Sequence, residues 1–148
     1  MVPYMNNQKV MRIIIFLSVV LLSCSNENND IKKEYYPNGK LKVIKNLKNG
    51  ITDGQAQWFY ATGSLEQIVS FRDGKENGNA YYFYQSGALK NFRNWKGGKM
   101  VGYGNDFFDS SVWIIKAVLY YNSLGDLIYR KTYDSLGNVI TEEGRIYK

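Results

Sequence analysis

Hydrophobic and polar positions alternate along much of this chain, as they do in a β-strand whose two faces differ. Gln67, Val69 and Phe71 fall on one predicted face, whereas Glu66 and Ile68 fall on the other. Short stretches of this kind are separated by turns that contain glycine, often next to Asn, Asp or Ser. The pattern predicts consecutive antiparallel strands joined by hairpins.

The turn glycines recur with one period. Three series share a spacing of 24 residues, namely Gly39, Gly63 and Gly87, then Gly50, Gly74 and Gly98, then Gly54, Gly78 and Gly102. Three columns follow the same spacing, namely Tyr35, Phe59, Phe83 and Phe107, then Tyr36, Tyr60, Tyr84 and Phe108, then Leu41, Leu65, Leu89 and Trp113. Because a lone hairpin is marginally stable in water, we expect the copies to pair edge to edge and to stack their aromatic side chains.

The repeat unit resembles a known repeat type. The segments YYPNGKLK, WFYATGSL and YYFYQSGALK, together with the turns NGITDG and DGKENG, are similar to the MORN-type repeat in the variant found in YwqK-like antitoxin proteins. The resemblance extends from about Tyr35 to Phe108 and implies an elongated single-layer sheet. We therefore predict an all-β fold, an antiparallel meander of β-hairpin repeats with a 24-residue period over residues 34–110.

A shorter period follows Phe108. The segment YNSLGDLI, which starts at Tyr121, is echoed twelve residues later by YDSLGNVI, which starts at Tyr133. Since twelve is half of 24, we predict that residues 111–148 continue the same meander with a different turn and cap the sheet. YDSLGNVI also resembles the YD repeats of Rhs-type shell proteins, but two copies are too few to form an enclosing shell.

The first residues have the pattern of an export signal. Lys9 and Arg12 precede an apolar stretch of ten residues from Ile13 to Leu22. Ten helical residues rise about 15 Å, whereas a membrane-spanning helix needs about 20 residues. The pattern therefore predicts a signal-peptide helix over residues 1–23, and it leaves open whether Met1, Met5 or Met11 is the true start.

The segment Leu21-Leu22-Ser23-Cys24 ends the apolar stretch and resembles the lipobox of bacterial lipoproteins. The resemblance implies that the leader is removed and that Cys24 carries the lipid, a diacylglycerol with further acylation such as palmitate. Ser25 next to this cysteine resembles the Gram-negative signal for transport to the outer membrane. We thus expect an envelope protein, lipid-anchored in the outer membrane of a Gram-negative bacterium, with an acylated and polar tether at residues 24–33.

The composition argues against most site chemistry. One cysteine and no histidine leave no intrachain disulfide, no Cys/His zinc site and no Ser-His-Asp arrangement. The glycines sit in predicted hairpin turns and do not open helices, so no phosphate loop is expected. The net charge is +6, and the Lys and Arg residues are scattered. We expect no catalytic residues, no metal, no cofactor and no nucleic-acid partner.

The aromatic residues are the candidate binding groups. Adjacent aromatics place rings on both faces of a one-layer sheet, although their regular spacing also fits a repeating core. The candidate partner-binding residues are Trp58, Phe59, Tyr60, Tyr82, Phe83, Tyr84 and Trp95. We expect a non-enzymatic protein-interaction module on the membrane, whose partner is a toxin-like or envelope protein if the antitoxin resemblance extends to function. The alternative is an envelope structural or glycan-binding module.

Overall fold

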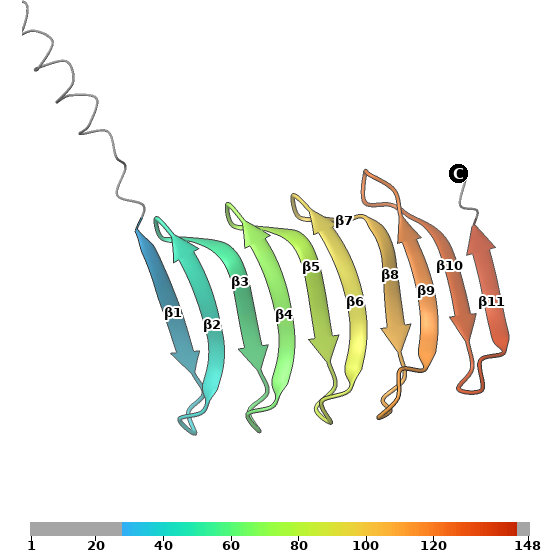
Figure 1. The fold of residues 1–148 in the computed structure, drawn as a ribbon, viewed down its shortest axis with the longest axis horizontal. Coiled ribbons are helices and arrows are strands. Elements are labelled where there is room, and N and C mark those ends of the chain that lie inside the picture. Colours follow the sequence, from blue (N-terminus) through green and yellow to red (C-terminus); the bar gives the residue numbers. More distant parts are fainter. Residues whose placement is uncertain (1–27, 145–148) are drawn as a thin grey trace, which may run out of the picture.

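A computed structural model describes residues 28–144, which form one open sheet of 11 strands (Figure 1). The strands are β1 (Asn29–Tyr35), β2 (Leu41–Lys48), β3 (Ile51–Phe59), β4 (Leu65–Arg72), β5 (Lys75–Phe83), β6 (Leu89–Lys96), β7 (Lys99–Met100), β8 (Gly102–Phe107), β9 (Ile115–Tyr121), β10 (Leu127–Tyr133) and β11 (Val139–Gly144). No helix occurs within this part of the chain. The predicted all-β fold is confirmed.

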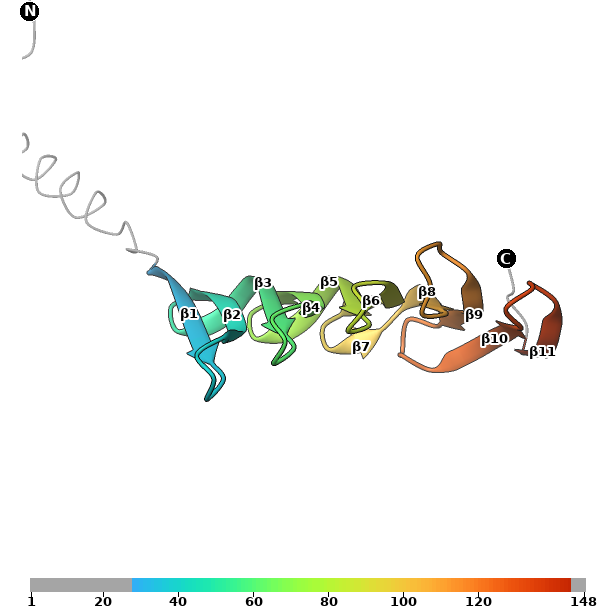
Figure 2. The ribbon, with the colours of Figure 1, turned by 90° about the horizontal axis from the view of Figure 1, so that it is seen from below.

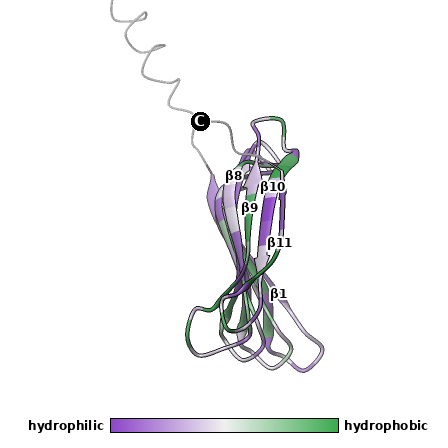
Figure 3. Cartoon of the chain, turned by 90° about the vertical axis from the view of Figure 1, so that its right-hand side faces the viewer, coloured by the Kyte–Doolittle hydropathy of each residue, from purple (hydrophilic) through white to green (hydrophobic). Residues whose placement is uncertain are grey.

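The order of the strands in the sheet follows the sequence. Each strand pairs antiparallel with the next along the path, and the short β7 pairs with β6 beside that path. Seen from below and end-on, the strands form a single elongated layer (Figures 2 and 3). The predicted single-layer meander is therefore confirmed, and each strand makes its contacts with its immediate neighbours.

The predicted leader helix over residues 1–23 and the predicted lipid site Cys24 lie outside the described residues. The sheet itself starts earlier than predicted. β1 begins at Asn29, so residues 29–33 are strand and not tether. The alternating sequence here, with Ile31 between charged residues, can pair with β2 although it contributes little apolar surface.

The turns lie along the two borders of the sheet where the strands end, which we call the lower and the upper edge as they are drawn in Figure 1. Turns of two kinds alternate between these two borders. At the edge drawn lowest in Figure 1, a five-residue turn places Gly39 at φ 80°, and its Tyr36 N–H donates to the Lys40 carbonyl over 2.8 Å. The same hydrogen bonds close the turns at residues 60–64 and 84–88. At the upper edge, Asn49 and Gly50 both have positive φ and form a two-residue turn, whose twist suits a hairpin.

The five-residue turn also explains why the period falls to twelve. The turn at residues 134–138 lies at the lower edge, and the turn at 122–126 has the same pair of backbone hydrogen bonds at the upper edge. The upper edge thus changes its turn after β9, as predicted, by adopting the turn that the lower edge already uses. Consecutive hairpins then become alike, and the sequence repeats after every strand.

A row of small side chains forms the core of this single layer. Ala56, Val69 and Ala80 are partners in the strand register, so they share one face, which we name the alanine face. Ala56 and Ala80 are 0% exposed, although no second layer covers them. The Trp58 and Phe71 rings lie on the same face, two residues along their strands from the small residues, with centroids 6.2 Å apart. Large side chains therefore close over the small ones within the sheet itself.

Aromatic rings pack against one another between strands, but the rings in contact are not equivalent positions of the repeat. Three of the four ring pairs within the described part of the chain join neighbouring strands, as in Tyr81 with Phe92 and Tyr103 with Tyr120, and the fourth joins Phe107 to Trp113 of the following loop. Residues 24 positions apart lie two strands apart, about 9.5 Å, whereas paired rings lie about 4.5–7 Å apart. The repeat is therefore held together by contacts between unlike positions of adjacent strands.

Candidate functional site

The predicted partner-binding residues do not form one site. Trp58, Tyr82 and Trp95 lie on the alanine face. Trp58 and Tyr82 follow Ala56 and Ala80 by two residues, and Trp95 follows by two residues the β6 partner of Ala80. Phe59 and Phe83 follow directly after Trp58 and Tyr82, which turns them to the opposite face. Tyr60 and Tyr84 open the lower turns. All seven residues are half-buried.

The two turn tyrosines have a structural role. The Tyr60 hydroxyl donates to the Phe83 carbonyl over 2.7 Å, and the Tyr84 hydroxyl donates to the Phe107 carbonyl over 3.0 Å. Tyr36 makes the corresponding bond one repeat earlier. Burial raises the pKa of Tyr60, and two nearby carboxylates add to the shift. These hydroxyls join each lower turn to the following hairpin, so their hydrogen atoms are already used in bonds within the sheet and are not offered to a ligand.

The aromatics of the alanine face also pack within the sheet. Trp58 contacts Phe71, and the Lys45 ammonium group lies 5.9 Å from the centroid of the Trp58 ring. Burial raises the pKa of the Tyr82 hydroxyl, and the neighbouring Trp95 side chain partly opposes that shift. The repeating-core interpretation therefore fits these residues better than a ligand site does.

An open hollow lies where the regular repeat ends. Its volume is about 710 Å³, and it lies between the lower turn 84–88 and the loop 108–114. Apolar and polar groups share the lining, which consists of Tyr81, Phe83, Ser86, Gly87, Ala88, Leu89, Asp109, Ser110, Ser111 and Trp113. Of the predicted binding residues, Phe83 alone lines this hollow.

The loop beside the hollow is a turn with an insertion. The Phe108 N–H donates to the Ile114 carbonyl over 3.0 Å, which closes seven residues, whereas the same bond closes five in the other lower turns. As a result Ile115, and not Trp113, pairs with Phe107 as Leu89 pairs with Phe83. The assignment of Trp113 to the leucine column is therefore wrong, because two extra residues carry it out of the strand.

Trp113 is the most conspicuous residue that the sequence pattern did not identify as a binding group. Its side chain is 78% exposed, and its ring lies 6.3 Å from that of Phe107. It borders the hollow described above and a second one of about 460 Å³, which also includes Ile115 and Leu136. The sequence contained one indication that this turn differs, because Ser111 stands where the 24-residue period would place a turn glycine.

Other exposed apolar side chains lie around this tryptophan. Val112 is 61% exposed, Ile115 41% and Leu136 86%. We name Val112, Trp113, Ile115 and Leu136 the Trp113 surface. Polar groups lie at its border, where the Ser86 hydroxyl donates to the Asp109 carboxylate. An exposed apolar group of this kind is typical of a binding surface.

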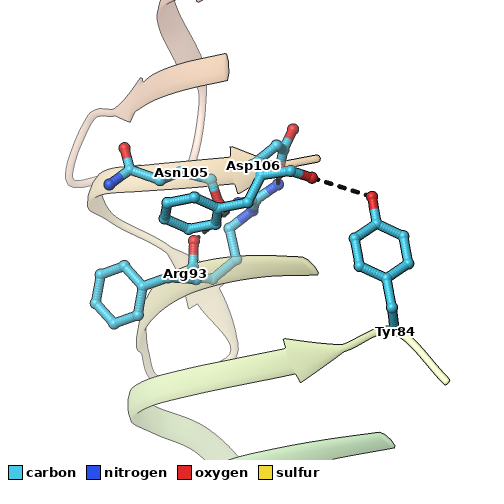
Figure 4. Close-up of polar contacts among 6 residues, drawn as sticks. Tyr84, Arg93, Asn105 and Asp106 are labelled. Atoms are coloured by element: carbon cyan, nitrogen blue, oxygen red, sulfur yellow. Dashed lines mark hydrogen bonds and ion pairs between the residues drawn. The ribbon is translucent and has the colours of Figure 1, made fainter. Parts of the chain in front are cut away.

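A charged cluster lies close by and has a structural explanation. The Arg93 guanidinium donates to the Phe92 carbonyl over 2.8 Å and to the Asn105 carbonyl over 3.0 Å, and it forms an ion pair with Asp106 (Figure 4). The Arg93 side chain is 13% exposed. Because these bonds connect β6 with β8, Arg93 serves as a clamp between two strands.

Acidic residues of the turns also bond to the backbone. The Asp53 carboxylate accepts the Asp73 N–H of the next upper turn over 3.1 Å. Within residues 28–144, no three His, Cys, Asp or Glu side chains gather as metal ligands would. The same residues include no helix that could span a bilayer.

Comparison with known proteins bears out the repeat type. The family of the MORN repeat variant matches residues 31–49 and 52–73, which cover the first hairpins of the sheet. No curated protein matches the chain. A mutant of TarM from S. aureus is similar in structure, with 9% identity over 93% of this chain and 22% of that chain and a TM-score of 0.41.

The accessory secretory proteins 1, 2 and 3 of Streptococcus pneumoniae give a similar result, with 18% identity over 76% of this chain and 19% of that chain and a TM-score of 0.36. The chain thus spans about a fifth of the length of the solved chains that it matches.

Proposed function

We propose that this chain is a lipid-anchored envelope protein whose repeat sheet is a non-enzymatic protein-interaction module, and that the Trp113 surface contacts the partner. The observation that carries the proposal is the 78% exposed indole between two hollows. Tryptophan is among the residues that contribute most to protein interfaces, since one ring covers a large apolar area with little loss of entropy.

The lipobox-like segment supports the anchoring part of the proposal. β1 begins five residues after Cys24, so a lipid on this cysteine would hold the sheet near the bilayer surface. Mass spectrometry of the mature protein tests this part directly. We expect a first residue Cys24 that carries acyl chains, and a mature protein with a free Cys24 thiol would contradict it.

The resemblance to YwqK-like antitoxin proteins supports an antitoxin or immunity-like role, with a toxin-like or envelope protein as the partner. The geometry is compatible with such a partner, because the Trp113 surface is open at the sheet edge and extends over the loop 108–114 and the turn 134–138. An open surface with several exposed apolar side chains suits a folded protein better than it suits a small solute.

The first prediction concerns Trp113. A photoreactive residue at Ser111 should cross-link the chain to a partner in the native envelope. Trp113→Ala should lower the yield of this product about 30-fold, because a hot-spot residue contributes about 2 kcal/mol or more. Leu124→Ala is the matched control, since Leu124 is also exposed, at 67%, but lies in the upper turn 122–126. Equal yields from the two variants would contradict the proposal.

A glycan is the second candidate partner, and one observation favours it. The hollow combines an exposed indole with the Ser86 hydroxyl and the Asp109 carboxylate, and sugars bind through a stacked ring together with such hydrogen-bonding groups. Sedimentation of the purified protein with isolated peptidoglycan or polysaccharide, lost in Trp113→Ala and retained in Leu124→Ala, would favour this alternative over a protein partner.

A further inference from the structure

Among residues 28–144, the two edge strands of the sheet carry opposite charges at one height. β1 forms one edge and presents Lys32 and Lys33 between the acidic Asp30 and Glu34, whereas β11 forms the other edge and presents Glu142 and Glu143. All four residues lie at strand positions and not in turns. Free edges also expose backbone N–H and C=O groups that can pair with a further strand.

The strand register connects these charges across the sheet. Lys33 pairs with Ile44, and the row of partners continues through each strand until Lys131 pairs with Glu142. A second unbroken row starts at Glu34 and ends at Thr141. The lysines of β1 and the glutamates of β11 therefore stand at the same height in the sheet.

The direction of the strands is also suitable. Ten strands lie on the path from β1 to β11, and every neighbouring pair is antiparallel, so β1 and β11 run in opposite directions. A second copy that placed its β1 beside β11 would continue the antiparallel alternation. In the register of the existing rows, Lys33 of that copy would lie opposite Glu142, and its Lys32 would lie opposite Glu143.

We propose that copies of this chain associate head to tail by pairing β11 of one copy with β1 of the next. Opposite charges at directly facing positions favour a strand pair, and like charges disfavour it. Pairing of two β11 strands centred on Glu142 or Glu143 would place that glutamate opposite its own equivalent. The charges therefore favour the continuation of the sheet over symmetric pairing at the β11 edge.

Two of the four charged side chains at these edges are unpaired. Within residues 28–144, Glu143 and Lys33 form no ion pair, whereas the Lys32 ammonium group pairs with the Glu34 carboxylate of its own strand over 3.3 Å. Glu142 is held by Lys131 at 2.9 Å and by the Tyr129 hydroxyl at 3.1 Å. A head-to-tail contact uses different surfaces on the two copies, so each pair of copies still presents one unpaired β1 and one unpaired β11 for further copies.

The test uses the full chain in detergent and measures its mass by sedimentation velocity over a range of concentrations. We choose Lys32→Glu and Glu143→Lys because they leave the pair of Lys131 and Glu142 intact. Each change alone replaces an attractive pair with a repulsive one and should weaken association about tenfold. Both changes in one chain should restore it, since the opposite charges then face each other again.

Lys75→Glu is the matched control, because it changes the net charge equally at an exposed position of β5, away from both edges. A mixture of the Lys32→Glu and Glu143→Lys proteins should associate as the wild type does, and this arm holds even if the double variant does not fold. A wild-type chain that stays monomeric, or a mixture that does not associate, would overturn the proposal. Trp113→Ala should leave the association unchanged, which separates this inference from the proposed partner site.

Discussion

At the scale of single residues, a hydroxyl group explains the second aromatic column. Tyr36, Tyr60 and Tyr84 each donate to a strand-end carbonyl of the following hairpin, over 2.7 to 3.0 Å. The fourth member, Phe108, lacks the hydroxyl at the point where the 24-residue repeat ends. The column therefore reflects a hydrogen bond between repeats, and its periodicity is a property of the fold and not of a ligand site.

Removal of one such hydroxyl should cost stability but not binding. Tyr60→Phe leaves the ring in place and deprives the Phe83 carbonyl of its donor, so the free energy of unfolding should fall by about 0.5–1.5 kcal/mol. Tyr103→Phe is the control, because Tyr103 is 53% exposed and donates no such bond. Urea unfolding measures both. An unchanged Tyr60→Phe protein would show that the hydrogen bond contributes nothing to the repeat.

At the scale of elements, the junction of β6 and β8 is the distinctive place in the sheet. β7 takes over the pairing with one end of β6, and β6 and β8 share two register pairs, whereas most neighbouring strands share five or more. Arg93 bridges this junction from the alanine face. The Gly104 position opposite leaves room for it, since a Cβ there would lie 3.1 Å from the Arg93 Cδ. A side-chain clamp thus compensates for a short ladder.

Arg93→Ala should therefore loosen the sheet at this junction. The change leaves the Asp106 carboxylate, 25% exposed, and two carbonyls without their donor, so we expect a loss of about 1–3 kcal/mol in unfolding free energy. Arg130→Ala removes an exposed arginine from β10, two strands beyond β8, and should change stability by less than about 0.5 kcal/mol. Thermal unfolding measures the stability of both variants. Equal losses of stability would contradict a clamping role for Arg93.

At the scale of the whole molecule, the sheet is a linear series in which each strand contacts its neighbours. The main contacts join consecutive strands of the path, and the buried side chains are spread from Val43 to Leu119 and do not form one central cluster. A molecule of this kind behaves as a sum of repeats and interfaces. Its length can therefore change in whole repeats without disturbing the remaining pairs.

Deletion of residues 60–83 should preserve the fold. This removes 24 residues and joins Phe59 to Tyr84, so the turn 84–88 takes the place of the equivalent turn 60–64. β3 then lies beside β6, and Ala56 takes the place of Ala80 opposite Arg93. Deletion of residues 60–71 removes half a repeat, so β3 is followed by the two-residue turn at 73–74 and by β5, its own equivalent, and the side chains of these two strands meet in a register that no existing strand pair has. Circular dichroism should show cooperative unfolding for the first protein and its loss for the second. The reverse result would contradict the repeat register.

Local pattern alone determined most of the fold. The alternation of residues such as Val69 with Ile68, and the turn glycines such as Gly39 at φ 80°, act over a few bonds and define strands and turns wherever they occur. Neighbouring hairpins then pair in order, because each strand ends beside the start of the next. The order and direction of the strands therefore follow from the amino-acid sequence by itself.

Only the tertiary structure decided which side chains meet. The seven predicted aromatics divided between two faces and two turns, and the exposed Trp113 lies in a loop lengthened by a two-residue insertion, which the period did not predict. The position of Lys33 and Glu142 in one row across the sheet likewise depends on the register of every intervening strand. Contacts across strands depend on loop lengths and register summed along the chain, whereas alternation and turn chemistry depend on adjacent residues.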